Sequence, residues 1–332
     1  MSHGVGIIGA GLIGNKRALA LTELGGQCVA VFDKSPQRAG ELASRFGAHV
    51  EIEAEALIAR KDIDAIIVCT SNDVIPVYAK QAIQAGKHVL IEKPGGRNPD
   101  EIRDLMKVAG AGQSILKVGF NHRFHPALQK ARELLENGAI GSLMYFRARY
   151  GHGGRVGYDR EWRAIPEISG GGELLDQGIH LLDLCRWLGG EFQLEFGSAK
   201  TFFWDMAVED NGFLLLKSPD GTRSAFLHAS CTEWKNTFEF EAFGRTGKIQ
   251  ILGLGGSYGT EEIRVYKRPP EGGVPILETS SFPGPDLSWQ DEWKAFEAEI
   301  SGKHTHLGDI KDALAALEIV YQTYGAQRAA LK

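Results

Sequence analysis

Apolar and polar residues alternate in two different ways along the chain, and the change falls near residue 120. Up to that point, short apolar runs rich in β-branched residues are separated by segments that are expected to be helices. Strands buried on both faces read as continuous apolar runs, and their alternation with helices is typical of βαβ units. The pattern predicts an α/β domain with a doubly wound parallel sheet. Its strands are expected at residues 4–8, 28–32, 65–69, 88–91 and 115–119, and its helices near residues 12–24, 74–84 and 99–109 and after Ser35.

Beyond residue 120, strand-like runs follow one another without helices between them. Residues 143–150 alternate apolar and polar side chains with the period of a half-buried strand, and one helix is expected near residues 173–188. This order predicts an α+β domain with a mostly antiparallel sheet, framed by a helix near residues 126–136 and by two terminal helices. We therefore expect one domain at residues 1–120 and a second at 121–332. Further strands are expected at residues 201–204, 212–217, 223–230, 237–243, 248–252 and 262–267.

Length, charge and cysteine content exclude several classes of protein. The 332 residues correspond to about two domains, and the net charge of −5, without a long run of one sign, argues against a nucleic-acid or membrane-surface partner. No segment approaches the apolar run of about 18 residues that a membrane span needs. The four cysteines are far apart and form no Cys-x-x-Cys pair, which fits a reducing cytoplasm. A small, soluble ligand is the expected partner.

A cluster of glycines follows the first expected strand and opens the first helix, in the order Gly-Ala-Gly-Leu-Ile-Gly. Gly9 permits a tight turn, Gly11 lets the backbone approach a pyrophosphate, and Gly14 allows the helix to pack closely on the strand. The N–H groups at the helix N-terminus, at Leu12 and Ile13, favour an anion. The segment predicts a dinucleotide-binding loop.

The second expected strand ends at Asp33, 19 residues after Gly14. A carboxylate at this place accepts hydrogen bonds from the ribose hydroxyls of the adenosine and repels a 2′-phosphate, which favours NAD over NADP. The neighbouring Lys34 weakens this preference because a cation tolerates a phosphate. The alternative is that Asp33 only caps the helix that begins at Pro36.

Two further groups of polar residues are candidates for the chemistry. Lys93, in Glu92-Lys93-Pro94, follows a parallel strand at the edge where open α/β sheets bind ligands, and its ammonium suits an oxygen that gains negative charge. Asp176 and His180 are four residues apart and would face the same way on one helix, with the imidazole transferring a proton near neutral pH. The alternatives are a solvated lysine paired with Glu92, and a surface ion pair or a buried structural histidine.

These motifs occur in an order that resembles one enzyme family over essentially the whole chain. The glycine loop, Asp33, Glu92-Lys93-Pro94, the run Gly-Phe-Asn-His-Arg-Phe from Gly119, and the triple glycine before Asp176 and His180 are similar to those of the glucose-fructose oxidoreductase, inositol dehydrogenase and rhizopine-catabolism (Gfo/Idh/MocA) family. The resemblance implies a Rossmann domain followed by an open, mostly antiparallel sheet that often serves as an oligomer interface, and hence a homodimer or homotetramer.

The resemblance also implies the roles of single residues. Lys93, Asp176 and His180 match the catalytic lysine, aspartate and histidine of the family. One departure is Ile75, which stands where many members carry a histidine. Cofactor-binding residues are expected at Gly9, Gly11, Leu12, Ile13, Gly14, Asp33, Thr70, Ser71, Asn72, Glu92 and Lys93.

The implied activity is hydride transfer between NAD, rather than NADP, and a secondary hydroxyl or ketone of a sugar, a sugar acid, a nucleotide sugar or an inositol. In this mechanism His180 removes the hydroxyl proton and Lys93 hydrogen-bonds to the reacting oxygen. Two alternatives remain: a redox-neutral, NAD-assisted glycoside hydrolase of the same family, and a noncatalytic NAD-binding regulator. The complete set of Lys93, Asp176 and His180 argues against the regulator.

Substrate contacts are expected from the loop after the strand at residues 143–150, because arginine there suits a carboxylate or phosphate. The alternative is that its cations form surface ion pairs with Asp159, Glu161 and Glu167. Two histidine pairs, His122-x-x-His125 and His304-x-His306, lack a convincing third ligand, so no metal is expected. The expected substrate-binding residues are Asn121, Arg123, His152, Arg155, Trp162, Arg163, Asp176 and His180.

Overall fold

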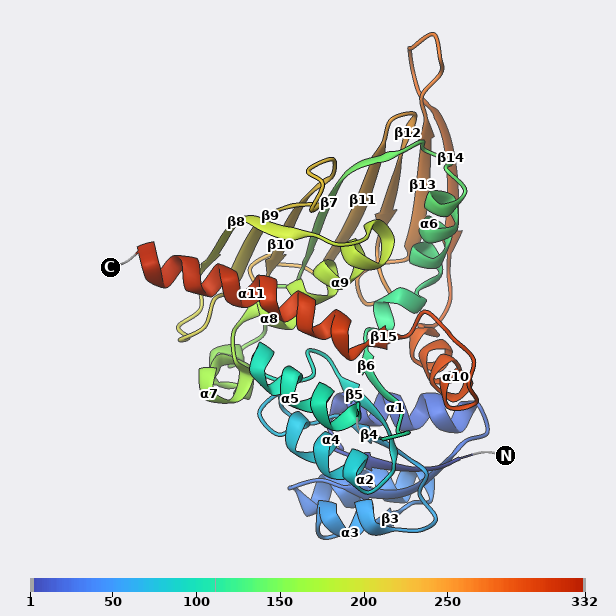
Figure 1. Ribbon diagram of the computed structural model, residues 1–332, viewed down its shortest axis with the longest axis vertical. Coiled ribbons are helices and arrows are strands. Elements are labelled where there is room, and N and C mark those ends of the chain that lie inside the picture. Colours follow the sequence, from blue (N-terminus) through green and yellow to red (C-terminus); the bar gives the residue numbers. More distant parts are fainter. Residues whose placement is uncertain (1–2, 111, 331–332) are drawn as a thin grey trace. The chain divides into compact units, whose positions relative to one another are not determined.

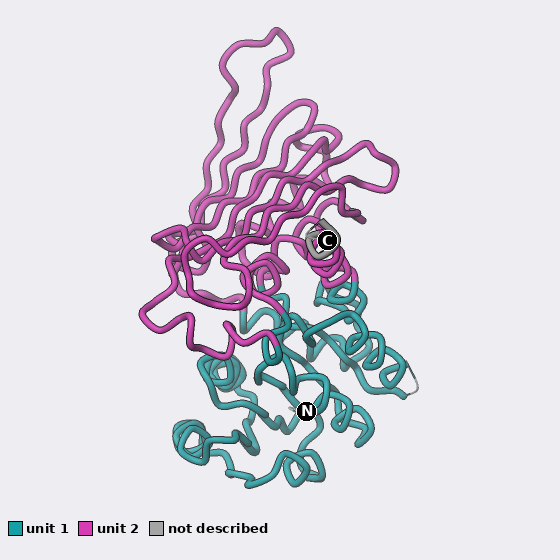
Figure 2. Tube along the Cα trace, turned by 90° about the vertical axis from the view of Figure 1, so that its left-hand side faces the viewer, with its two compact units in different colours: residues 1–121, 167–170, 289–314 teal, residues 122–166, 171–288, 315–332 magenta. Residues whose placement is uncertain are grey.

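The computed structural model describes residues 3–110 and 112–330 of the chain. They fold into two compact units, which Figure 2 shows in different colours. The first unit contains residues 1–121, 167–170 and 289–314, and the second contains residues 122–166, 171–288 and 315–332. The sequence pattern predicts one boundary near residue 120; in the structure, two later segments also belong to the first unit.

The described part of the first unit is built on a seven-stranded sheet with the strand order β15-β6-β5-β4-β1-β2-β3. Figure 1 labels β15, β6, β5, β4 and β3 of this sheet. The strands from β6 to β3 pair in parallel, and the short β15 pairs antiparallel with β6. Ile7, Ile66 and Leu90 are fully buried in these strands, which explains the continuous apolar runs. The strands are β1 Gly4–Ile8, β2 Gln27–Phe32, β3 His49–Val50, β4 Ala65–Val68, β5 His88–Glu92, β6 Leu116–Gly119 and β15 Gly308–Asp309.

Helices follow most of these strands and confirm the predicted βαβ pattern, while β3, α3 and β15 were not predicted. Two of the helices begin with a side-chain cap and a proline: Ser35 accepts a hydrogen bond from Arg38 N, and Asn98 accepts one from Glu101 N. The helices are α1 Leu12–Glu23, α2 Pro36–Phe46, α3 Ala54–Ala59, α4 Ile75–Gln84, α5 Pro99–Ala109, α7 Pro166–Ser169 and α10 Ser288–Ile300.

The described part of the second unit contains an eight-stranded sheet with the order β14-β13-β12-β11-β7-β10-β9-β8. All neighbours pair antiparallel except β7 and β10, so the prediction of a mostly antiparallel sheet is confirmed. The strands are β7 Leu143–Gly151, β8 Gln193–Lys200, β9 Asn211–Lys217, β10 Ser224–Ser230, β11 Thr237–Gly244, β12 Gly247–Leu252, β13 Glu261–Lys267 and β14 Ile276–Phe282.

Helices of the second unit pack on this sheet: α6 on β12, β13 and β14, and α9 on β7 and β10. On β7, Phe146 and Tyr150 are buried while Tyr145, Arg147 and Arg149 are exposed, which confirms the predicted alternation from Tyr145 onward. Met144, which was expected on the buried face, is 37% exposed. Among the described residues, no helix is long and apolar enough to cross a membrane. The remaining helices and turns are η1 Asn121–Phe124, α6 Pro126–Glu136, η2 Tyr158–Arg160, η3 Trp162–Ala164, α8 Glu173–Asp176, α9 Gly178–Gly189 and α11 Ile310–Ala330.

The strand predicted at residues 201–204 is wrong. The carboxylate of Asp210 accepts hydrogen bonds from the backbone N–H groups of Phe202, Phe203 and Trp204, at 2.7 to 3.1 Å. These donors are therefore used by a side chain instead of a neighbouring strand, and the segment forms bends. The strand in this region is β8, which ends one residue earlier, at Lys200.

The single helix predicted near residues 173–188 is also wrong, because the helix is interrupted at Gln177. Asp176 ends α8, and His180 lies in the first turn of α9 with its N–H donating to the carbonyl of Gln177. A Cβ at Gly178 would lie 2.8 Å from the Leu174 side chain, which would then have to shift. Asp176 and His180 are thus not an i and i+4 pair on one continuous helix.

Candidate active site

The three glycines of the loop after β1 have three different surroundings. Gly9 has a φ of +103°, and a Cβ there would lie 2.4 Å from the carbonyl oxygen of Cys69. A Cβ at Gly14 would lie 2.0 Å from the carbonyl oxygen of Gly9, which explains why α1 can approach β1 so closely. A Cβ at Gly11 would meet no described atom within 4 Å. Two glycines are thus needed by the fold, and the third borders open space.

The N-terminus of α1 adjoins this open space. Gly11 is its N-cap and no side chain caps the helix there, while the Leu12 side chain is 75% exposed. Uncapped N–H groups and the partial positive charge of a helix N-terminus suit a phosphate group. The residues present therefore fit the pyrophosphate of a nicotinamide dinucleotide.

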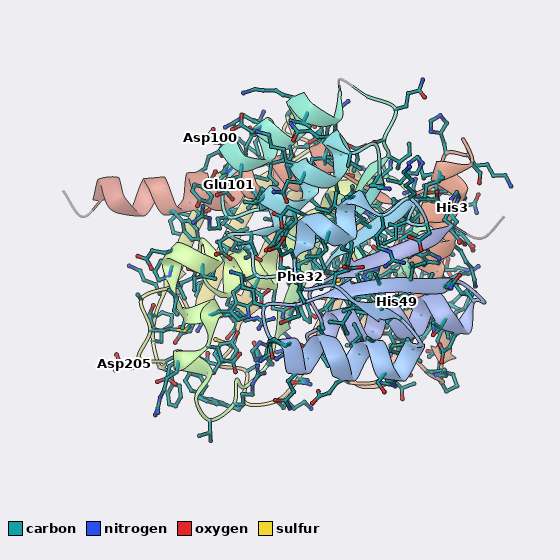
Figure 3. The ribbon with its side chains drawn as sticks, turned by 90° about the horizontal axis from the view of Figure 1, so that it is seen from below. His3, Phe32, His49, Asp100, Glu101 and Asp205 are labelled. Carbon is teal, nitrogen blue, oxygen red and sulfur yellow. The ribbon has the colours of Figure 1, made fainter. Side chains whose placement is uncertain are left out.

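Asp33 lies directly after β2, whose last residue, Phe32, is labelled in Figure 3. One carboxylate oxygen accepts a hydrogen bond from Ala10 N at 2.7 Å, and the other accepts one from Ser35 N at 2.8 Å. The cap of α2 is Ser35, so the alternative in which Asp33 caps this helix is wrong. Each carboxylate oxygen has a second lone pair, which leaves Asp33 able to accept hydrogen bonds from a ribose as well.

The loop between β4 and α4 contains three residues that were predicted to bind the cofactor. Thr70 and Ser71 are half-buried, and the Ser71 hydroxyl donates to Asp73 at 2.6 Å. The buried Asn72 donates from its amide to the carbonyl oxygen of Ser169 at 2.8 Å. Asn72 thus holds the segment 167–170 within the first unit.

Lys93 is half-buried and follows β5 directly, at the carboxyl end of the parallel sheet. The preceding Glu92 is 7% exposed and accepts a hydrogen bond from Arg17 Nε at 2.8 Å, and Arg17 Nη2 lies 2.6 Å from the same carboxylate oxygen in an ion pair. Arg17 also forms a buried ion pair with Glu292 of α10. Burial alone would lower the pKa of the Arg17 guanidinium, but the two carboxylates outweigh it and raise that pKa. The Glu92 side chain therefore belongs to a buried ionic cluster beneath Lys93.

In the second unit, Asp176 is held by an arginine. Arg163 Nε donates to Asp176 Oδ2 at 3.1 Å, and the guanidinium also lies 3.8 Å from Glu161 and over the ring of Trp162. Attraction by Asp176 is the largest of the effects that raise the pKa of Arg163. The predicted substrate residues Trp162 and Arg163 thus lie together with Asp176.

His180 is 3% exposed and packs among aromatic rings. Its imidazole stacks on that of His122, with the ring centroids 3.7 Å apart and the ring planes at 17°. Tyr150 approaches both imidazoles edge-on, and Tyr258 packs on Tyr150. Burial is the main cause that raises the pKa of Tyr150. The sequence places His122 in a family motif and beside His125, but nothing in it predicts this contact with His180.

Glu173 is a buried carboxylate beside these residues that the sequence analysis gave no role. The Tyr158 hydroxyl donates to its Oε2 at 3.2 Å, and His152 Nε2 lies 3.4 Å from its Oε1. Because Gly154 N donates to His152 Nδ1 at 2.9 Å, the neutral ring carries its proton on Nε2, facing Glu173. Burial lowers the pKa of His152. The predicted substrate residue His152 therefore contacts Glu173.

The remaining predicted substrate residues are engaged in other ways. Arg123 is buried and forms a two-pronged ion pair with Asp183 of α9. Arg155 is exposed and pairs with Glu161, as the surface alternative predicts. Asn121 is buried at the start of η1. In the part of the chain that the structure describes, no group of three or more His, Cys, Asp or Glu side chains is arranged to hold a metal ion.

Both regions of the chain that contain the candidate site residues are similar to known proteins. Residues 3–120 match the model of an oxidoreductase family with an NAD-binding Rossmann fold, and residues 128–250 match the model of the GFO/IDH/MocA C-terminal domain. Inositol 2-dehydrogenase of Rhizobium meliloti is 27% identical over 252 residues, which cover 74% of each chain. Trans-1,2-dihydrobenzene-1,2-diol dehydrogenase of Mus musculus is 30% identical over 255 residues, 75% of this chain and 74% of the mouse protein.

A solved structure of levoglucosan dehydrogenase in complex with NADH has the same fold. It superposes with a TM-score of 0.87 at 23% identity and covers 98% of both chains. The first model covers the glycine loop and Lys93, and the second covers Asp176 and His180. The chain belongs to the Gfo/Idh/MocA family of NAD-binding oxidoreductases.

Proposed function

We propose that the protein is a dehydrogenase, or a reductase in the reverse direction, that acts on a secondary hydroxyl or ketone of a sugar, a sugar derivative or an inositol. The observation that carries this proposal is the open glycine loop, which fits a pyrophosphate, in a chain that also holds Lys93, Asp176 and the buried His180. The names of the inositol and dihydrodiol dehydrogenases support a ring-borne CH–OH group as the substrate.

In the proposed mechanism, His180 accepts the proton of the substrate hydroxyl as the carbon is oxidised. The imidazole is nearly completely buried, so its nitrogen is protected from bulk water. Lys93 donates a hydrogen bond to the same oxygen and stabilises the negative charge that develops on it. Asp176, fixed by Arg163, accepts a hydrogen bond from a neighbouring hydroxyl of the substrate and orients the ring.

When bound, the nicotinamide dinucleotide supplies the hydride acceptor. Gly11 and the N-terminus of α1 would hold its pyrophosphate, and Asp33 would bind the adenosine ribose. We propose NAD as the preferred form because the Asp33 carboxylate repels a 2′-phosphate. Lys34 is exposed beside it and reduces this preference without reversing it.

The experiment is a screen of polyols, sugars, sugar acids and nucleotide sugars with NAD and with NADP, following the absorbance of the reduced cofactor. With the substrate found, His180→Ala and Lys93→Ala should each lower kcat by roughly 10²- to 10⁴-fold while NAD still binds. Lys107→Ala is the matched control, because that lysine is exposed and pairs only with Asp104 among the contacts described. Near-wild-type turnover in His180→Ala would refute the proposed chemistry.

The same screen separates the two alternative functions. Cleavage of a glycoside without net formation of NADH would support a redox-neutral hydrolase. Tight NAD binding without turnover of any compound would support a regulator.

We further propose that two copies associate through the exposed face of the sheet in the second unit. This face carries several large apolar side chains with 38 to 62% exposure, and gathered exposed apolar side chains are typical of surfaces that bind another protein. Light scattering of wild type and of Phe226→Glu tests the proposal, which predicts a smaller particle for the variant. The apolar residues are Tyr145, Phe196, Leu215, Phe226 and Leu277.

We also propose that the protein works in a reducing compartment, the cytoplasm, and its four free cysteines support this proposal.

A further inference from the structure

We propose that Glu209 is a positioning residue for Asp176. Its buried carboxylate fixes the turn on which α8 begins, and thereby the place of the Asp176 side chain at the end of that helix. The inference rests on the role proposed above for Asp176 as the group that orients the substrate. The carrying observation is that the backbone N–H groups of three consecutive residues, 172 to 174, all donate to Glu209.

These hydrogen bonds use both carboxylate oxygens and the carbonyl oxygen of Glu209. Gly172 N donates to Oε2 at 3.0 Å, Leu174 N donates to Oε1 at 3.1 Å, and Glu173 N donates to the carbonyl oxygen at 2.9 Å. N–H groups in the first turn of a helix find no acceptor within that helix. Gly172 is the N-cap of α8 and has no side chain that could accept, so Glu209 supplies the acceptors from the segment that leads into β9.

A further hydrogen bond transmits this constraint to Asp176. The carbonyl oxygen of Gly172, whose N–H donates to Glu209, accepts a hydrogen bond from Asp176 N at 2.9 Å. The helix α8 has only four residues, so it has few hydrogen bonds of its own that could fix its direction. At its end, Asp176 Oδ2 accepts from Arg163 Nε at 3.1 Å. A shift of Gly172 would therefore move Asp176 relative to Arg163 and to the substrate.

Two glycines before α8 let Glu209 and Tyr324 approach this turn. A Cβ at Gly172 would lie 1.9 Å from the carbonyl oxygen of Glu209, which is a backbone atom. A Cβ at Gly171 would lie 2.2 Å from the hydroxyl oxygen of Tyr324 in α11. The same hydroxyl donates to Glu209 Oε1 at 2.7 Å. The carboxylate is thus held by α11 on one side and holds the turn before α8 on the other.

Stability does not explain a carboxylate at this place. Glu209 is 8% exposed, and burial raises the pKa of its carboxyl although the hydrogen bonds that it accepts lower it. A raised pKa means that the charged form is less favourable in the folded protein than in the unfolded chain, so this charge opposes folding at neutral pH. A glutamine would avoid that cost but could accept with only one of its two terminal atoms. We therefore attribute the carboxylate to the two acceptors that the turn requires.

A double-mutant cycle of Glu209→Gln and Asp176→Ala tests this inference, with the substrate found in the screen above. Asp176→Ala should lower kcat/KM by roughly 10- to 100-fold, the value of a hydrogen bond to a charged group. Glu209→Gln should lower kcat/KM by about 10-fold when Asp176 is present, because misplaced substrate contacts are costly, and by less than about 2-fold in Asp176→Ala. Equal losses in both backgrounds would overturn the proposal, since Glu209 would then not act through Asp176.

Tyr324→Phe is a second variant that decides the matter if Glu209→Gln does not fold. It keeps the ring but removes the hydroxyl that donates to Glu209 Oε1. We expect it to lower kcat/KM by about 2- to 5-fold when Asp176 is present and to have no effect in Asp176→Ala. No loss with Asp176 present, or an equal loss in both backgrounds, would overturn the proposal.

Glu299→Gln is the matched control, because Glu299 is another carboxylate with 8% exposure that organises a loop. It accepts hydrogen bonds from Thr305 N at 2.8 Å and from the Thr305 hydroxyl at 3.0 Å, and it lies 3.4 Å from the Lys117 ammonium. Its replacement should lower the melting temperature but leave kcat/KM at the wild-type value. A loss of kcat/KM equal to that of Glu209→Gln would show that the effect is not specific to Glu209, and would overturn the proposal.

The outcomes also separate this inference from the proposed function. A wild-type kcat/KM in Asp176→Ala would refute the proposed contact of Asp176 with the substrate, and this inference with it. A loss in Asp176→Ala together with equal effects of Glu209→Gln in both backgrounds would refute only the role of Glu209.

Discussion

Replacing Arg17 should destabilise the fold strongly, because its side chain is buried and carries a charge. Its guanidinium is 2% exposed and pairs with Glu92 of β5 and with Glu292 of α10, whose side chain is fully buried. It also lies so close to Gly119 that a Cβ there would be 2.4 Å from Nη2. One cation therefore compensates two buried carboxylates from two other elements.

Replacing Arg17 with methionine keeps most of the volume but removes that cation. Breaking a buried ion pair by deleting one partner costs about 3 to 5 kcal/mol, because the charge left behind is desolvated and uncompensated. With a total stability of about 5 to 15 kcal/mol for a typical protein, this is a large fraction. We expect Arg17→Met to lower the free energy of unfolding by at least about 3 kcal/mol.

Urea unfolding followed by circular dichroism measures this loss. Arg103→Met is the matched control, since Arg103 is an exposed helical residue that pairs with the exposed Asp100, and it should change stability by less than about 0.5 kcal/mol. The deficit of Arg17→Met should also shrink as the pH falls, because the stranded carboxylates can then take up protons. A loss below about 1 kcal/mol at pH 7, or a deficit that does not change down to pH 5, would refute this account of the cluster.

Three further predictions follow from the same geometry. Gly11→Ala should leave the melting temperature unchanged but weaken NAD binding, which calorimetry measures. Gly14→Ala should lower the melting temperature, because its Cβ would meet the Gly9 carbonyl, and equal effects of the two variants would contradict the assignment of open space to Gly11. Asp33→Ser should lower the ratio of kcat/KM for NAD over NADP by about 10- to 100-fold, the value of a charged hydrogen bond, and an unchanged ratio would exclude a ribose contact. Burial opposes the ionised form of Asp210, but hydrogen bonds to the carboxylate outweigh it and lower the pKa of this carboxyl. The ionised Asp210 therefore stabilises the folded protein fully at neutral pH, and this contribution is lost as the pH falls through the acid range. Asp210→Asn should therefore show a flatter acid branch of its stability curve than wild type, and parallel curves would contradict the prediction.

Local sequence patterns predict most of the strands and helices of the first unit. The apolar runs of the parallel strands and the glycine loop are short-range signals, and the structure reproduces them because burial on both faces demands such residues. The family likeness placed Lys93, Asp176 and His180 on the candidate site, and their catalytic roles stay a prediction.

The parts that were missed depend on contacts between distant residues. Nothing around Arg17 in the sequence points to Glu292, which is 275 residues away. The apolar pattern after Lys200 predicts a strand, because it does not reveal that the Asp210 carboxylate accepts the hydrogen bonds of the backbone N–H groups there. The spacing of His122 and His125 suggested a metal ligand pair, whereas the stack on His180 only exists once η1 and α9 are packed together.

The return of residues 289–314 to the first unit has a consequence for how the protein is made. Arg17 and strand β6 leave the ribosome early. Glu292, which completes their surroundings, follows about 170 residues after β6 and 275 residues after Arg17, a delay of roughly 10 to 55 s at 5 to 20 residues per second. During this time the nascent first unit has one edge of its sheet unpaired and a buried cation with one partner missing. We expect most of the second unit, residues 122–166 and 171–288, to acquire structure before residues 289–314 complete the first unit.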